Sequence, residues 1–166
     1  MNIDWTLLAC GAATILCTLV AGIFLCFSDF LMRSLARSSP RAGIEVMQVI
    51  NREVYGTLFM VLLLGMSALA PLLGALAITH VEGPAATLMA AGGGLYLVGV
   101  FVVTAARNVP LNKRLDGMLS TDAATITYWT DVYVPRWTVW NHLRAGASLA
   151  AAVCFLLAGL LLAGAR

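Results

Sequence analysis

The stretch DVYVPRWTVWNHLR, from Asp131 to Arg144, is followed directly by a charge-free run, Ala145 to Ala165, that is long enough to cross a bilayer. Aromatic and polar side chains are concentrated in this stretch of an otherwise apolar chain. Pro135 is typical of the first turn of a helix, where its missing N–H is not needed, and we expect a helix to begin there. Residues spaced four and then three apart share one face of such a helix. That face carries Trp137, Asn141 and Arg144.

The composition is that of a membrane protein. Of the 166 residues, 61% are hydrophobic and 11% are charged, whereas a soluble domain carries about 25% charged residues. The length predicts one integral membrane domain, residues 1–166, with no nucleic-acid partner. The first apolar run follows Asp4 and has no preceding positive charge, so we interpret it as a retained transmembrane helix and not as a signal peptide.

Four apolar runs predict membrane-spanning helices, because a span needs about 20 such residues. We expect an all-α protein, a membrane-embedded antiparallel four-helix bundle whose second and fourth helices extend beyond the cytoplasmic membrane face. The predicted spans are residues 5–27, 54–79, 85–106 and 145–165.

Local signals refine this outline. Ser39 followed by Pro40 predicts the start of a second helix that continues to Val81. Pro71 predicts a kink or an early end in that helix, because it removes one backbone hydrogen bond. Residues 107–134 are predicted to be the longest segment outside the spans, with a short helix at 123–133.

The positive charges predict the orientation. Arg and Lys residues gather in two of the three connections, and an excess of such residues marks cytoplasmic segments. We therefore expect a protein of the bacterial inner membrane with both termini outside and both long connections in the cytoplasm. The residues are Arg33, Arg37, Arg41 and Arg52 in the first connection, and Arg107, Lys113, Arg114, Arg136 and Arg144 in the third.

Three polar clusters, at residues 47–53, 107–114 and 131–144, are expected to meet at one end of the bundle and to form a site there. No metal is expected in it. None of the four cysteines belongs to a CxxC pair, and His80 and His142 are predicted on opposite sides, which argues against zinc and against a haem held by two histidines.

Four segments, in this order, make the chain resemble the anthrone oxygenase-like family of four-helix integral membrane proteins. NVPLN followed by WTxWNHxR is the most specific part of the pattern. The segments are FSDFLM (27–32), MQVIN (47–51), VTAARNVPLN (103–112) and YVPRWTVWNHLR (133–144).

The resemblance implies an oxygenase that oxidises an anthrone, or another polycyclic or phenolic aromatic compound, with molecular oxygen and without a cofactor. Such a reaction needs a base for the acidic proton and hydrogen-bond donors for the resulting oxyanion. We expect His142, Asn141 and Asp131 to be catalytic. The side chains expected to bind the substrate are Trp137, Trp140, Trp129, Tyr133, Asn51, Gln48, Asn108, Asn112 and Arg144.

Other interpretations of the same residues stay open. Trp and Tyr often form interfacial belts, and Asn often caps or bridges helices. Arg107 and Arg144 are expected to serve orientation and to pair with carboxylates such as Asp131 or Glu53. His142 either borders the site or lies on the bundle surface. A non-catalytic membrane protein that binds a hydrophobic ligand, a lipid or a partner protein is the alternative function; a transporter has less support.

Overall fold

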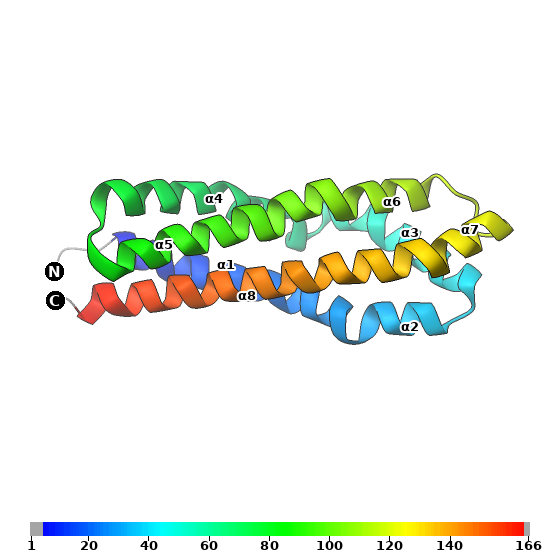
Figure 1. Ribbon diagram of the computed structural model, residues 1–166, viewed down its shortest axis with the longest axis horizontal. Helices are drawn as coiled ribbons and strands as arrows, with labels where there is room; N and C mark the ends of the chain where they lie inside the picture. Colours follow the sequence, from blue (N-terminus) through cyan, green and yellow to red (C-terminus); the bar gives the residue numbers. More distant parts are fainter. Residues whose placement is uncertain (1–4, 165–166) are drawn as a thin grey trace.

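The computed structural model describes residues 5–164, and every regular element in that range is a helix. Figure 1 shows long antiparallel helices that form one elongated bundle. This confirms the predicted all-α four-helix architecture of an integral membrane protein. The helical segments long and apolar enough to cross a membrane are Trp5–Arg37, Leu58–His80, Gly83–Asp116 and Ala123–Gly164.

Four helices form the apolar half of the bundle: α1 (Trp5–Cys26), α4 (Leu58–His80), α5 (Gly83–Tyr96) and α8 (Val134–Gly164). α1 packs against α8, α8 against α5, α5 against α4, and α4 against α1. The described ends of the chain and the α4–α5 turn lie at the same end of this bundle (Figure 1).

Small residues allow the close helix approach that holds membrane bundles together. At Gly93 of α5, an added Cβ would lie 2.7 Å from the Ala70 carbonyl oxygen of α4, so only glycine fits this crossing. Large apolar side chains on the outer faces are exposed, as expected where lipid replaces water. Examples are Leu8, Ile15, Leu72, Ile78, Val98 and Leu160.

The other half of the bundle carries most of the charges, and we call it the polar end: residues 28–57 and 104–144. It contains α2 (Met32–Arg37), α3 (Pro40–Glu53), α6 (Val109–Asp116) and α7 (Ala123–Tyr128). As predicted, Ser39 caps α3 and Pro40 occupies its first turn. This end has its own core, made of Met32, Ile44, Met47, Leu115, Tyr128, Trp129, Tyr133 and Trp137.

The second helix is not continuous, and the prediction that it runs from Pro40 to Val81 is wrong. A short 3₁₀ turn, Val54–Gly56, follows α3, and Thr57 is extended before α4 begins at Leu58. Gly56 is a poor helix former, which favours a break at this point. α4 then runs past Pro71 to His80, so of the two outcomes predicted for Pro71, a kink or an early end, the early end does not occur.

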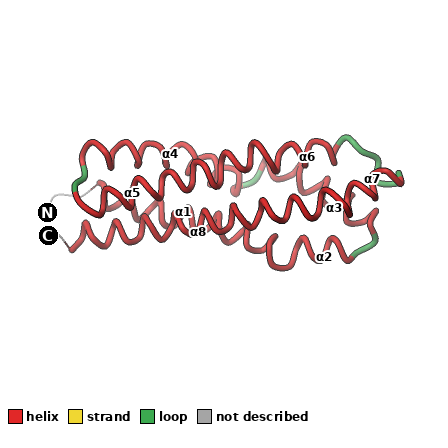
Figure 2. Tube along the Cα trace, viewed as in Figure 1, coloured by secondary structure: helices red, strands yellow, loops and turns green. Residues whose placement is uncertain are grey.

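In residues 107–134 the predicted short helix at 123–133 is confirmed, as α7 and the π-helical turn Trp129–Tyr133, whereas α6 was not predicted. Only residues 117–122 form a loop; Figure 2 shows helix on either side of it. Pro135 is the second residue of α8, but α8 continues without a break from the helix before it, so the whole helical segment begins at Ala123.

Proline is tolerated at these two places because a wider turn precedes it. A π-helical turn at Thr104–Asn108 ends two residues before Pro110, and another at Trp129–Tyr133 ends two residues before Pro135. A π-type turn shifts the hydrogen-bond pattern, so the missing proline N–H and the bulk of its ring are accommodated without ending the helix.

Candidate functional site

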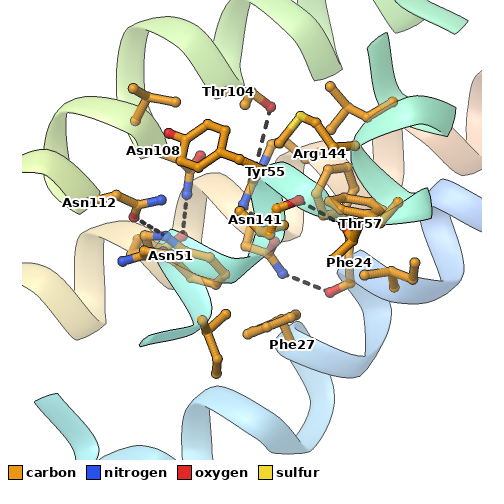
Figure 3. Close-up of a pocket in the computed structure, with 18 of the residues that line it drawn as sticks. Phe24, Phe27, Asn51, Tyr55, Thr57, Thr104, Asn108, Asn112, Asn141 and Arg144 are labelled. Atoms are coloured by element: carbon orange, nitrogen blue, oxygen red, sulfur yellow. Dashed lines mark hydrogen bonds between the residues drawn. The ribbon is translucent and has the colours of Figure 1, made fainter. Parts of the chain in front are cut away.

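A cavity of about 350 Å³ lies where the apolar half of the bundle meets the polar end. Its walls come from α1, α3, the 3₁₀ break, α4, α6 and α8, with the turn before α6 (Figure 3). Pockets for small organic molecules usually measure about 300–1,000 Å³, so this cavity suits such a ligand. It is lined by Ile23, Phe24, Phe27, Met47, Ile50, Asn51, Glu53, Val54, Tyr55, Thr57, Phe59, Met60, Leu63, Thr104, Asn108, Val109, Asn112, Trp137, Asn141 and Arg144.

One face of α8 brings Trp137, Asn141 and Arg144 into the cavity wall, as their spacing predicted. Asn141 links α8 to α1 and to the π-helical turn Phe27–Leu31 that follows α1. Its Nδ2 donates to the Phe24 carbonyl oxygen of α1 and to the Ser28 hydroxyl oxygen of that turn, each at 2.7 Å. Its Oδ1 accepts a hydrogen bond of 2.8 Å from Arg144 Nη2. All these groups of Asn141 are engaged within the protein, so Asn141 positions Arg144 rather than offering a free donor.

A second hydrogen-bond network surrounds Asn112 on α6. Its Oδ1 accepts from Tyr133 Oη and from Trp137 Nε1, both at 2.9 Å. Tyr133 Oη in turn accepts from Asn51 Nδ2 at 3.3 Å. The tyrosine hydroxyl therefore joins α3 and α6 to the π-helical turn before α8. Among the described residues, Asn112 Nδ2 has no hydrogen-bond acceptor, and it is therefore available to a ligand.

Asn108 lines the cavity and makes one hydrogen bond within the protein. Its Nδ2 donates to the Trp137 carbonyl oxygen at 3.3 Å, while its buried Oδ1 has no partner among the described residues. Buried polar atoms are nearly always hydrogen-bonded, so this acceptor is free to take a hydrogen bond from a further donor.

Aromatic rings form much of the remaining wall. Phe24 and Phe59 make an edge-to-face pair with ring centroids 5.5 Å apart. The ring of Phe27 lies 5.5 Å from that of Trp137. Rings of this kind bind flat apolar molecules through large contact area and stacking.

Six of the residues predicted for the site line this cavity: Asn51, Asn108, Asn112, Trp137, Asn141 and Arg144. The structure therefore brings the three polar clusters together. Asn112 reaches the cavity from α6, and Asn108 reaches it from the π-helical turn before α6. The cavity wall therefore depends on α6, a helix in a segment where the sequence predicted a loop.

The remaining predicted residues lie outside the cavity wall. His142 is exposed on the bundle surface, and Asp131 is exposed with its carboxylate bound to the Thr130 hydroxyl. Trp140 lies under the guanidinium of Arg107, 5.0 Å from the ring centroid. The expected pairing of Arg107 and Arg144 with carboxylates is wrong, because the ion pairs of the described residues are Arg41–Glu45 and Arg52–Asp116.

The other three predicted residues support the polar end from behind the cavity. Trp129 and Tyr133 stack with ring centroids 5.3 Å apart. Gln48 Nε2 donates to the carbonyl oxygens of Leu115 and Met118, both at 2.8 Å, and so closes the end of α6.

The sequence did not point to several of the lining residues. Phe24, Phe27 and Phe59 are indistinguishable from other apolar residues of a membrane span. Glu53, which the sequence suggested only as a partner for an arginine, is the last residue of α3, and Tyr55 lies in the 3₁₀ turn that follows. Both are exposed, Tyr55 by 60%, so they form the rim of the cavity. Glu53 carries the only carboxylate among the described residues that line the cavity.

Fold and cavity together define an integral membrane protein with a ligand-sized, aromatic and amide-lined pocket at the boundary of its apolar half. The pattern of the family described as anthrone oxygenase matches residues 46–154, and the chain belongs to that family. Apart from Ile23, Phe24 and Phe27, every residue that lines the cavity falls within the matched range. No curated protein matches the chain significantly, and neither does any solved structure.

Proposed function

We propose that this protein is a membrane-bound, cofactor-independent oxygenase that acts on an anthrone or on another polycyclic or phenolic aromatic compound. The observation that carries the proposal is the cavity itself: it has aromatic walls, an unengaged amide donor at Asn112 and a carboxylate at Glu53, and nearly all of it lies within the range matched by the family. Membership of the family supports the reaction type.

In the proposed reaction, a base removes a proton from the methylene carbon opposite the anthrone carbonyl. The resulting anion is electron-rich and transfers electrons to molecular oxygen, which supplies the oxidant. The methylene group loses two hydrogens and gains one oxygen atom, and the second oxygen atom leaves as water, so that anthrone plus O₂ gives anthraquinone plus H₂O. The protein supplies the base and the site that holds the flat ring system.

Glu53 is the base that we assign to this step. It is the carboxylate of the described cavity wall, whereas Asp131 and His142 do not line the cavity. Its place at the rim lets the removed proton pass on to water.

Oxygen uptake by membranes that contain the protein tests the proposal. With a simple anthrone as substrate, uptake is expected to exceed that of membranes without the protein, which corrects for spontaneous oxidation of the anthrone. A double variant, Asp131→Asn with His142→Ala, is the matched control, because both groups lie outside the cavity and their loss should leave the rate unchanged. A rate equal to that of empty membranes would reject the oxygenase proposal.

The second candidate is a non-catalytic protein that binds a hydrophobic ligand in the same cavity. It is favoured by the tight internal engagement of Asn141, whose hydrogen bonds serve the protein and leave no donor for catalysis. Binding of an aromatic compound without oxygen uptake would select this candidate.

We also propose that the polar end faces the cytoplasm of a bacterial inner membrane. The support is the distribution of Arg and Lys, which are concentrated in the two connections at the polar end.

A further inference from the structure

The environment of Arg144 is unusual for a cation. Its side chain lies in the cavity wall, and the residue is only 5% exposed. Nη2 donates to Asn141 Oδ1 at 2.8 Å and Nη1 to the Thr104 hydroxyl oxygen at 3.4 Å, and both partners are neutral. Neither ion pair of the described residues includes Arg144.

Burying a charge without a counter-charge is unfavourable unless something else compensates it. Two aromatic rings provide part of the compensation: the guanidinium carbon lies 4.3 Å from the ring centroid of Phe24 and 5.3 Å from that of Trp137. The Nε atom nevertheless has no hydrogen-bond partner among the described residues. The positive charge of Arg144 is therefore only partly compensated by the described residues.

The surroundings keep this charge in a fixed place. Asn141 is itself held by the Phe24 carbonyl oxygen of α1 and by Ser28 in the π-helical turn Phe27–Leu31 that follows α1, so the acceptor that orients Arg144 is anchored on this helical segment (Figure 3). A charge that is oriented before the ligand arrives gives selectivity without the cost of ordering a flexible side chain.

We propose that Arg144 binds an anionic oxygen attached directly to the ring system of the ligand, so that the cavity selects planar aromatic compounds in their ionised form, as a phenolate or an enolate. The planar ring class rests on the proposed function; the preference for an anion rests on Arg144 alone. The ring lies among Phe24, Phe27 and Trp137, with its oxygen directed toward the guanidinium.

The test uses 2-hydroxyanthraquinone, which is already at the quinone level, so that binding is measured without turnover. Its phenol and phenolate absorb at different wavelengths. The wild-type protein in lipid nanodiscs is titrated with pH in the presence of this compound. The bound phenol is expected to ionise at least one pH unit below the free phenol, which corresponds to at least tenfold tighter binding of the anion. Ionisation at the same pH or a higher one would overturn the proposal, and this arm requires no variant.

Variants then assign the effect to Arg144. Arg144→Met should abolish the shift, whereas Arg144→Lys should keep its sign because it keeps the charge. Arg107→Met is the matched control: that arginine also lies over a tryptophan ring but does not line the cavity, and its loss should leave the shift intact. Unsubstituted anthraquinone should bind equally to wild type and Arg144→Met, which shows that the variant is folded. A shift that persists in Arg144→Met would overturn the assignment.

The two proposals fail independently in these experiments. A preference for the anion without any uptake of oxygen would leave a binding protein for ionised aromatic compounds. Oxygen uptake with no preference for the anion would leave an oxygenase whose Arg144 has a structural role.

Discussion

Asn141 and Arg144, one turn apart on α8, form a hydrogen-bonded pair in which the amide oxygen of Asn141 accepts from the guanidinium at 2.8 Å. The same amide is anchored to α1 through the carbonyl oxygen of Phe24, and to the π-helical turn after α1 through the hydroxyl of Ser28. One side chain therefore joins two helices and aims the only cation of the described cavity wall.

Replacing Asn141 by Ala should lower the stability of the bundle and weaken the preference for an anionic ligand. Several buried partners lose a hydrogen bond, and each unsatisfied group costs about 1–3 kcal/mol. The matched control is Ser148→Ala, which removes another buried hydrogen bond between α8 and α1, from the Ser148 hydroxyl to the Cys17 carbonyl oxygen, away from the cavity. Thermal unfolding and ligand titration of both variants separate the two effects: Ser148→Ala should lose stability only. Equal loss of anion preference in both would contradict a specific role of Asn141.

Glu53→Gln should lower oxygen uptake with an anthrone by roughly 10²–10⁴-fold, the usual contribution of a general base, while binding of anthraquinone stays near the wild-type value. Glu45→Gln, on the same helix but outside the cavity wall, is the comparison; its carboxylate binds Arg41 and the Ser120 hydroxyl. Initial rates over a range of anthrone concentrations distinguish a loss of kcat from a rise in KM. A Glu53→Gln variant with the wild-type rate of oxygen uptake would show that Glu53 is not the general base.

Gly93→Ala should destabilise the bundle by about 1–3 kcal/mol, because the new methyl group would overlap the Ala70 carbonyl oxygen and force α4 and α5 apart. Gly94→Ala is the adjacent control, with no atom within 4 Å of an added Cβ. That change should be neutral or should stabilise the helix by about 0.5–1 kcal/mol, since glycine is unfavourable in helix interiors. Thermal unfolding in one detergent is the measurement, and equal melting temperatures would show that the crossing is looser than the structure has it.

The proposed orientation predicts the activity of reporter fusions. Alkaline phosphatase fused after Arg166 should be active, and the same enzyme inserted into the loop at 117–122 should be inactive, because it folds only outside the inner membrane. Green fluorescent protein should give the opposite pattern at both positions. The reverse result would mean that the distribution of Arg and Lys does not set the orientation of this protein.

The sequence predicted the bundle because four apolar runs leave few alternatives in a bilayer. It also predicted the buried face of α8, since Trp137, Asn141 and Arg144 repeat with the helical period. Both predictions depend on local patterns that need no knowledge of neighbouring segments.

The failures lie where local signals are ambiguous. Pro135 was interpreted as the start of a new helix, but the π-helical turn at Trp129–Tyr133 joins α8 to the helix before it. The break at Val54–Gly56 left no clear signal, because glycine also occurs within the spans. The anchoring of Asn141 by the backbone of Phe24 joins positions 117 residues apart, and no pattern in a single sequence records such a contact.

The cavity lies where the apolar half of the bundle meets the charged half, so its ligand is expected to arrive already dissolved in lipid. An apolar polycyclic compound accumulates in the bilayer, because each buried apolar group favours transfer out of water. The concentration that governs occupancy is then the mole fraction of the compound in the lipid phase. At a fixed total amount of substrate, added empty vesicles should dilute it and slow the reaction, and kinetic constants for this protein are comparable only at one ratio of lipid to substrate.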